Sequence, residues 1–217
     1  MRYRAVLFDM DGTVLDTLED LYQAVNRSLE EFQLPIVSRE QVRAGLGNGA
    51  AHLIACCVPG DCPPELRQQV LDWYKPWYDA HCRIATQPYP GIVPLMQRLK
   101  ARGVKLAIIS NKPDPAVREL AEAFFPGLLE TAVGESATVR RKPDPSAVLT
   151  AAERMGIPLC ECVYVGDSEV DVQTAQNAGM DGIFVSWGFR TRQQLLEAGA
   201  AAIADTAEEL ETLLHEP

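Results

Sequence analysis

Two aspartates stand one residue apart at the end of an apolar run near the start of the chain, Asp9 and Asp11 in the stretch RYRAVLFDMDGTVLDT. In an extended strand, residues i and i+2 point to the same side, so both carboxylates are expected to project into the same space. Two like charges that close repel each other, and a shared proton or a bound cation is the usual compensation. A strand that runs into an acidic turn is the alternative, because Asp and Gly are common turn residues.

Other apolar runs of the chain also end in polar or charged side chains. The run LAIISNKP ends in Ser110, Asn111 and Lys112, RRKPDP places Lys142 before a helix start, and YVGDSEVDVQTAQNAG contains Asp167 and Asp171. A binding site at the carboxyl edge of a parallel sheet draws on several strand ends. We therefore expect these side chains to meet at one edge.

The chemistry that these groups favour is phosphoryl transfer. Asp9, Asp11 and Asp167 are hard oxygen ligands, and a site with few carboxylates that leaves room for phosphate oxygens suits Mg²⁺. Ser110 and backbone amides at a helix start can hold phosphate oxygens, whereas Lys142 can neutralise charge on a transferring phosphoryl group. A carboxylate nucleophile would carry the group as an acyl phosphate.

The elements that must position these residues alternate between strand and helix. Apolar runs at 3–8, 104–109, 162–166 and 182–185 predict strands buried on both faces, and 131–134 is a fifth candidate. Helices are expected to begin near Ile92, Pro115, Pro145, Glu169 and Thr191. This alternation predicts an α/β fold with a doubly wound parallel sheet, a Rossmann-like core.

One region breaks the alternation directly after the first strand. Residues 16–83 contain helical periodicity, and Ser38 to Gln41 has the pattern of a capping box. We expect a helical cap domain at 16–83, inserted into a catalytic core of 1–15 and 84–217. An insertion at the carboxyl end of a strand predicts a lid over the site, and a helical extension without such a role is the alternative.

The charge and the hydrophobicity of the chain argue against two classes of binding partner, nucleic acids and membranes. The formal net charge of the 217 residues is −10, which argues against a nucleic-acid partner held by Lys and Arg. No apolar stretch approaches the roughly 18 residues of a membrane span, and the chain begins with a strand pattern instead of a signal peptide. We expect a cytoplasmic protein without a membrane or nucleic-acid partner, either monomer or homodimer.

The stretches DMDGT, SNK, KP and GDSEVD, in this order, resemble the four signature motifs of the haloacid dehalogenase superfamily, with a helical cap after the first motif. The resemblance implies that Asp9 attacks phosphorus and that Asp11 protonates the leaving group and then activates water. Asp9, the backbone carbonyl of Asp11 and Asp167 would hold Mg²⁺, with Asp171 orienting the metal shell.

In the same resemblance, Ser110 and Asn111 bind phosphate, and Lys142 offsets its charge. The second aspartate, Asp11, favours phosphatases and phosphomutases over dehalogenases, which typically lack it. The predicted enzyme is a phosphoric monoester hydrolase that acts on a small phosphorylated metabolite.

Two further stretches bear on the substrate. VRAGLGNGAAHLI and the segment from Trp187 to Leu210 resemble phosphoglycolate phosphatases, and Arg43 in the first could bind a small anionic leaving group. A solvated Arg43 beside a Gly-rich turn is the alternative. Phosphoglycolate is the leading substrate. A β-phosphoglucomutase-like phosphomutase, a pyrophosphatase or nucleotide phosphatase, and a non-enzymatic phosphate-binding protein remain as alternatives.

Overall fold

The computed structural model describes residues 2–215, which divide into two compact units. The core unit contains the chain up to Leu15 and from Pro88 onward, and the helical unit contains Asp16–Gln87. The lid role expected of the helical segment stays a prediction.

The core unit is built on a six-stranded sheet in which all neighbours are parallel. The strand order is β5-β4-β1-β6-β7-β8. The strands are β1 (Ala5–Asp9), β4 (Lys105–Pro113), β5 (Thr131–Glu135), β6 (Cys162–Gly166), β7 (Asp181–Val185) and β8 (Ile203–Ala204). The short β8 and a separate sheet of β2 (Leu15–Asp16) and β3 (Gln87–Pro88) carry too little periodicity to be predicted.

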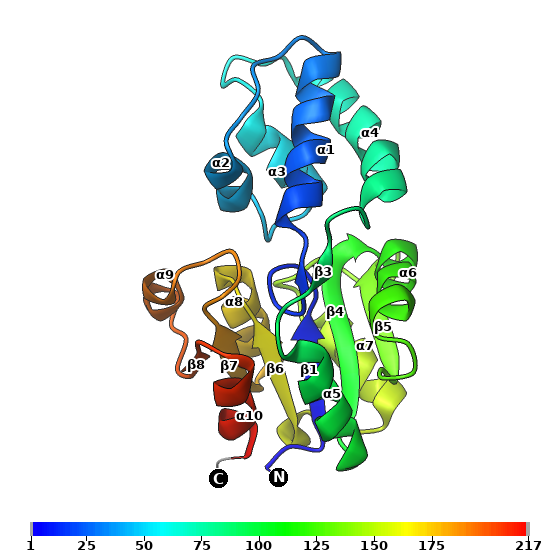
Figure 1. The fold of residues 1–217 in the computed structure, drawn as a ribbon, viewed down its shortest axis with the longest axis vertical. Helices are drawn as coiled ribbons and strands as arrows, with labels where there is room; N and C mark the ends of the chain where they lie inside the picture. The colour runs from blue at the N-terminus through cyan, green and yellow to red at the C-terminus, as the bar shows by residue number, and fades with distance from the viewer. Residues whose placement is uncertain (1, 216–217) are drawn as a thin grey trace. The chain divides into compact units, whose positions relative to one another are not determined.

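Helices cover both faces of this sheet, with α5 and α10 in front of it and α7 and α8 behind it (Figure 1). The helices of the core are α5 (Ile92–Ala101), α6 (Asp114–Phe124), α7 (Ser146–Met155), α8 (Glu169–Ala178), α9 (Arg192–Glu197) and α10 (Ala207–His215). The predicted doubly wound α/β fold is confirmed.

The central strands are buried on both faces, which explains their unbroken apolar sequence. Every residue of β1 and of β6 is buried. β1 lies between β4 and β6, with Leu7 in register with Ala107 on one side and Tyr164 on the other. The carboxyl ends of these three strands are therefore neighbours, and Asp9 is the last residue of the middle one.

The helical unit consists of α1 (Leu18–Glu31), α2 (Arg39–Ala44), α3 (Ala50–Cys57) and α4 (Pro64–His81). The predicted capping box is confirmed: the side chain of Ser38 accepts a hydrogen bond from the backbone of Gln41, and the Gln41 side chain accepts one from Ser38. Among residues 2–215, every helix is too short or too polar to cross a bilayer.

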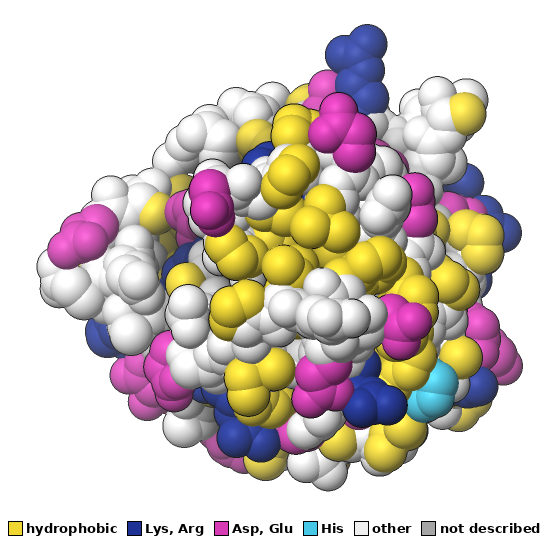
Figure 2. Space-filling view, turned by 90° about the horizontal axis from the view of Figure 1, so that it is seen from above, with side chains coloured by type: hydrophobic (Ala, Val, Ile, Leu, Met, Phe, Trp, Pro, Cys, Tyr) yellow, Lys and Arg dark blue, Asp and Glu magenta, His cyan; other side chains and the backbone are white. Residues whose placement is uncertain are grey.

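Some hydrophobic side chains are exposed. Figure 2 shows hydrophobic side chains gathered on the face it views, bordered by acidic and basic ones. The large hydrophobic residues with the greatest exposure are Ile36 at 63% and Ile84 at 74%, both in the helical unit. Exposed apolar atoms are ordinary on folded proteins.

A buried carboxylate joins the start of the helical unit to its end. Asp20, in the first turn of α1, is 4% exposed. Its carboxylate accepts hydrogen bonds from the backbone N–H of Ala85 at 2.9 Å and of Thr86 at 2.8 Å. These bonds tie together backbone that lies 65 residues apart in the chain.

We predict that Asp20→Ala lowers the free energy of unfolding by about 1–3 kcal/mol, because the buried N–H of Thr86 and the part-buried N–H of Ala85 lose their acceptor. Urea denaturation followed by circular dichroism measures the change. Asp61→Ala, which truncates an exposed loop carboxylate, should stay within about 0.5 kcal/mol of the wild type. Equal stability of the two variants would show that Asp20 does not hold the unit together.

Candidate active site

Three carboxylates and one ammonium group are buried together at the carboxyl edge of the sheet. Asp9 ends β1, Asp167 follows β6, Asp171 lies in the first turn of α8, and Lys142 lies in the loop before α7. One oxygen of each carboxylate lies within 4.8 Å of the other two. Lys142 Nζ lies 2.7 Å from Asp9 Oδ1 and 2.7 Å from Asp171 Oδ1. We call Asp9, Asp167 and Asp171 the acidic cluster.

One ammonium group does not neutralise this cluster. Burial, followed by the charge of Asp171, raises the pKa of Asp9 to about 7. Burial and the charges of Asp171 and Asp9 also hold the pKa of Asp167 well above its usual range. For Asp171, burial acts in the same direction but Lys142 and its hydrogen bonds outweigh it, so its pKa is lowered.

The donor set of the cluster fits a divalent cation. Three buried carboxylates share one ammonium group, so a further positive charge among them would relieve the repulsion that raises the pKa values of Asp9 and Asp167. Carboxylate oxygens are also the ligands that Mg²⁺ prefers.

Hydrogen bonds orient Asp171 within the cluster. Its Oδ2 accepts from the backbone N–H groups of Asp167 and Ser168 and, at 2.7 Å, from the Ser168 hydroxyl. Its Oδ1 accepts from the Tyr164 hydroxyl at 3.0 Å as well as from Lys142. Asp171 Oδ2 thus accepts three hydrogen bonds and Oδ1 two, whereas each Asp167 oxygen accepts one, so Asp171 is better placed to orient neighbouring groups than to supply a ligand atom.

Asn111 fixes the backbone at Lys142. Its Oδ1 accepts a hydrogen bond from the Lys142 backbone N–H at 2.7 Å, and its Nδ2 donates to the Lys142 carbonyl at 3.3 Å. Ser110 is 3% exposed, and its hydroxyl accepts from the Lys112 N–H at 3.3 Å. The structure thus brings Ser110 and Asn111 to the carboxyl end of β4, while phosphate binding by either one stays a prediction.

Asp11 lies near Asp9, since after burial and the charge of Asp171 the charge of Asp11 also raises the pKa of Asp9, but it has a different cationic partner. Strand β1 ends at Asp9, so the expected strand geometry does not continue to the second aspartate. The Asp11 carboxylate forms an ion pair with Lys112 at 2.9 Å and is not part of the acidic cluster. The two carboxylates therefore have separate cationic partners, which offset part of the repulsion that their spacing implied.

Arg43 is the one predicted site residue that belongs to the helical unit. It is exposed and lies in the last turn of α2. The other seven predicted residues, Asp9, Asp11, Ser110, Asn111, Lys142, Asp167 and Asp171, belong to the core unit. Contact of Arg43 with a substrate stays a prediction.

Three further residues at this edge contact the predicted site residues, although the sequence alone predicted no catalytic or binding role for them. Tyr164 donates to Asp171, Lys112 pairs with Asp11, and the Thr13 hydroxyl donates to Asp167 Oδ1 at 3.1 Å. Lys112 directly follows the predicted phosphate-binding pair, and Thr13 follows Asp11 by two residues, so proximity to the motifs was a usable signal. Tyr164 lies inside an apolar strand and gives no such signal.

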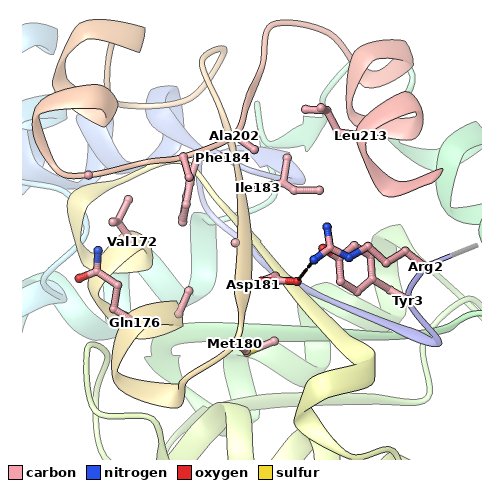
Figure 3. Close-up of a pocket in the computed structure, with 14 residues that line it drawn as sticks. Arg2, Tyr3, Val172, Gln176, Met180, Asp181, Ile183, Phe184, Ala202 and Leu213 are labelled. Atoms are coloured by element: carbon pink, nitrogen blue, oxygen red, sulfur yellow. Dashed lines mark hydrogen bonds and ion pairs between the residues drawn. The ribbon is translucent and has the colours of Figure 1, made fainter. Parts of the chain in front are cut away.

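A separate cavity of about 460 Å³ lies at the opposite, amino-terminal edge of the sheet (Figure 3). Asp181, the first residue of β7, accepts hydrogen bonds there from Arg2 at 2.8 Å and from the Tyr3 hydroxyl at 2.9 Å. Burial, followed by the hydrogen bond to Asp181, raises the pKa of Tyr3 to about 12. None of the predicted site residues lines this cavity.

We predict that Lys142→Met lowers the free energy of unfolding by about 3–5 kcal/mol in EDTA at neutral pH, because the buried carboxylates lose their cation. Urea denaturation measures the change. Lys100→Met removes a lysine from an ion pair whose side chains are 41% and 46% exposed, and should cost about 1 kcal/mol or less. A Lys142→Met protein as stable as the Lys100→Met protein would contradict the electrostatic account of the cluster.

The chain has recognisable relatives. Residues 6–185 match the model of the haloacid dehalogenase-like hydrolase family. A phosphoglycolate phosphatase of Xanthomonas campestris pv. campestris is 34% identical over 196 residues, which cover 88% of this chain and 86% of that protein.

Solved structures show the same arrangement of elements. A crystal structure of a protein from Lactobacillus delbrueckii subsp. bulgaricus aligns with a TM-score of 0.94 at 39% identity over 99% of both chains. That protein is named a phosphoglycolate phosphatase by inference. CbbY from Rhodobacter sphaeroides, in complex with xylulose-1,5-bisphosphate, aligns with a TM-score of 0.78 at 26% identity over 96% of both chains.

Proposed function

Since the chain belongs to the haloacid dehalogenase-like hydrolase family, we propose that it hydrolyses phosphoglycolate through a phosphorylated Asp9 with the help of Mg²⁺. The sequence-based resemblance and the predicted enzyme class, a phosphoric monoester hydrolase, are confirmed by its relatives. The substrate, the metal and the roles of individual residues are parts of the proposal.

The observation that carries the proposal is the different setting of the two aspartates. Asp9 is buried, and one of its oxygens is held by Lys142. Asp11 is partly exposed and pairs with Lys112. Two carboxylates in different environments can divide the work, one as nucleophile and the other as proton donor and acceptor.

In the proposed first step, an Asp9 carboxylate oxygen forms a bond to phosphorus while the bond between phosphorus and the ester oxygen breaks. Asp11, which has to carry a proton in this step, gives it to the departing oxygen. In the second step, Asp11 takes a proton from water, the water oxygen bonds to phosphorus, and the bond to Asp9 breaks. Inorganic phosphate leaves, and both aspartates return to their starting states.

The remaining residues hold these groups in place. Lys142 orients Asp9 and offsets the charge of the phosphoryl oxygens, while Asn111 fixes the backbone of Lys142. Mg²⁺, held by Asp9, Asp167 and the Asp11 backbone carbonyl, would supply further positive charge at the phosphoryl group when bound. Asp171 would orient these ligands.

The names of the relatives support the choice of substrate. Several curated relatives at 31–34% identity are phosphoglycolate phosphatases. The CbbY structure contains a sugar bisphosphate, which favours sugar phosphates as the second class to test. The expected cytoplasmic location and the choice between monomer and homodimer stay predictions.

We predict that phosphate release is fastest from phosphoglycolate in a panel that also contains xylulose-1,5-bisphosphate, a hexose phosphate, a nucleotide and pyrophosphate. The measurement is kcat/KM for each compound, with Mg²⁺ and with EDTA. Asp9→Asn should reduce release at least about a thousandfold, since the nucleophile is lost, whereas Asp61→Asn should leave it unchanged.

Comparable rates of phosphate release from every ester would agree with a phosphatase but would refute phosphoglycolate as the preferred substrate. Interconversion of sugar phosphate isomers without net release would indicate a phosphomutase. Near-normal activity of Asp9→Asn would refute the mechanism.

A further inference from the structure

The segment after β7 contacts Asp167, one of the proposed Mg²⁺ ligands, but takes no part in the proposed reaction steps. We propose that Trp187, Gly188 and Phe189 form a positioning segment that holds the Asp167 carboxylate against the loop after β1 and so sets the affinity of the site for Mg²⁺. This inference rests on the proposed function, because it concerns the same metal site.

Hydrogen bonds hold both oxygens of Asp167. The backbone N–H of Phe189 donates to Asp167 Oδ2 at 2.6 Å. The Thr13 hydroxyl donates to Asp167 Oδ1 at 3.1 Å, and the Trp187 indole N–H donates to the Thr13 carbonyl at 3.1 Å. The segment therefore contacts Asp167 directly through one oxygen and indirectly, through Thr13, on the other side.

Close packing adds a steric constraint at Gly188. A Cβ atom at this position would overlap both Asp167 Oδ2 and the carbonyl oxygen of Gly12. A Cβ atom at Gly12 would overlap the same Asp167 carboxylate. The carboxylate thus lies between two glycines. Gly188 is required only because a side chain would not fit, since its φ lies outside the left-handed region. Gly12 is required for space and also for its backbone conformation, since its φ is 83°.

Contacts on either side anchor the segment. Arg190, 8% exposed, forms an ion pair with Glu169 in the first turn of α8, at 2.6 Å. The ring of Trp187 lies 6.3 Å from that of Tyr89, centroid to centroid. The ion pair connects the segment to α8, whose first turn also carries Asp171, and the ring contact connects it to the stretch before α5.

The predicted consequence is on metal affinity. Mg²⁺ requires near-ideal octahedral geometry, and residues that orient its ligands typically change affinity 10- to 100-fold when they are altered. A segment that merely fills the protein core would change stability but would not change Mg²⁺ affinity in the folded protein.

The test is isothermal titration calorimetry of Mg²⁺ binding to the full chain. We expect Gly188→Ala to weaken binding about 10- to 100-fold, with a wild-type circular dichroism spectrum in EDTA. Gly60→Ala is the matched control, because this glycine has open space around it and no left-handed φ. Its Mg²⁺ affinity should equal that of the wild type.

Trp187→Phe keeps one aromatic ring but removes the indole N–H together with part of the ring volume. It should weaken Mg²⁺ binding by a smaller factor, up to about tenfold, and it decides the matter if Gly188→Ala does not fold. Wild-type affinity in the folded variants would overturn the inference while the proposed function stands. A wild-type protein that releases phosphate but binds no Mg²⁺ would refute the proposed metal site itself.

Discussion

Burial of like charges is the constraint on which this structure depends. Asp9, Asp167 and Asp171 are withdrawn from water with Lys142 between two of them. Burial in low dielectric penalises each charged form, and the neighbouring carboxylates add to that penalty. The site is stable only if hydrogen bonds and positive charge compensate. The hydrogen bonds of Ser168, Tyr164, Thr13 and Phe189 and the position of Lys142 all meet this need.

The parallel sheet brings the residues of the acidic cluster together. Strands β4, β1 and β6 are neighbours, so their carboxyl ends bring Ser110, Asp9 and Asp167 to one edge although more than 150 residues separate the first aspartate from the last. The start of α8 then adds Asp171, fixed by the Ser168 cap. Rigid strands and a capped helix hold the carboxylates more exactly than long loops would.

The sequence predicted those parts of the structure that depend on local periodicity and on strand ends. The apolar strands, the helix starts near Ile92 and Glu169 and the Ser38 capping box needed only neighbouring residues. The ion pair of Asp11 with Lys112 and the contact of Gly188 with Asp167 depend on which segments pack together, which no local pattern specifies. For the same reason Tyr164, inside an apolar strand, could not be recognised as a partner of Asp171.

The central claim is that Asp9 carries the phosphoryl group, and acid quenching within the first turnover tests it most directly. Wild-type and Asp11→Asn proteins are mixed with phosphoglycolate labelled in its phosphate, quenched and digested. The account predicts label on the peptide that contains Asp9. In the Asp11→Asn protein the label should form more slowly, because the leaving group lacks its acid, and should be lost more slowly, because water lacks its base. Complete release of labelled phosphate in the first turnover, with no labelled peptide in either protein, would contradict it.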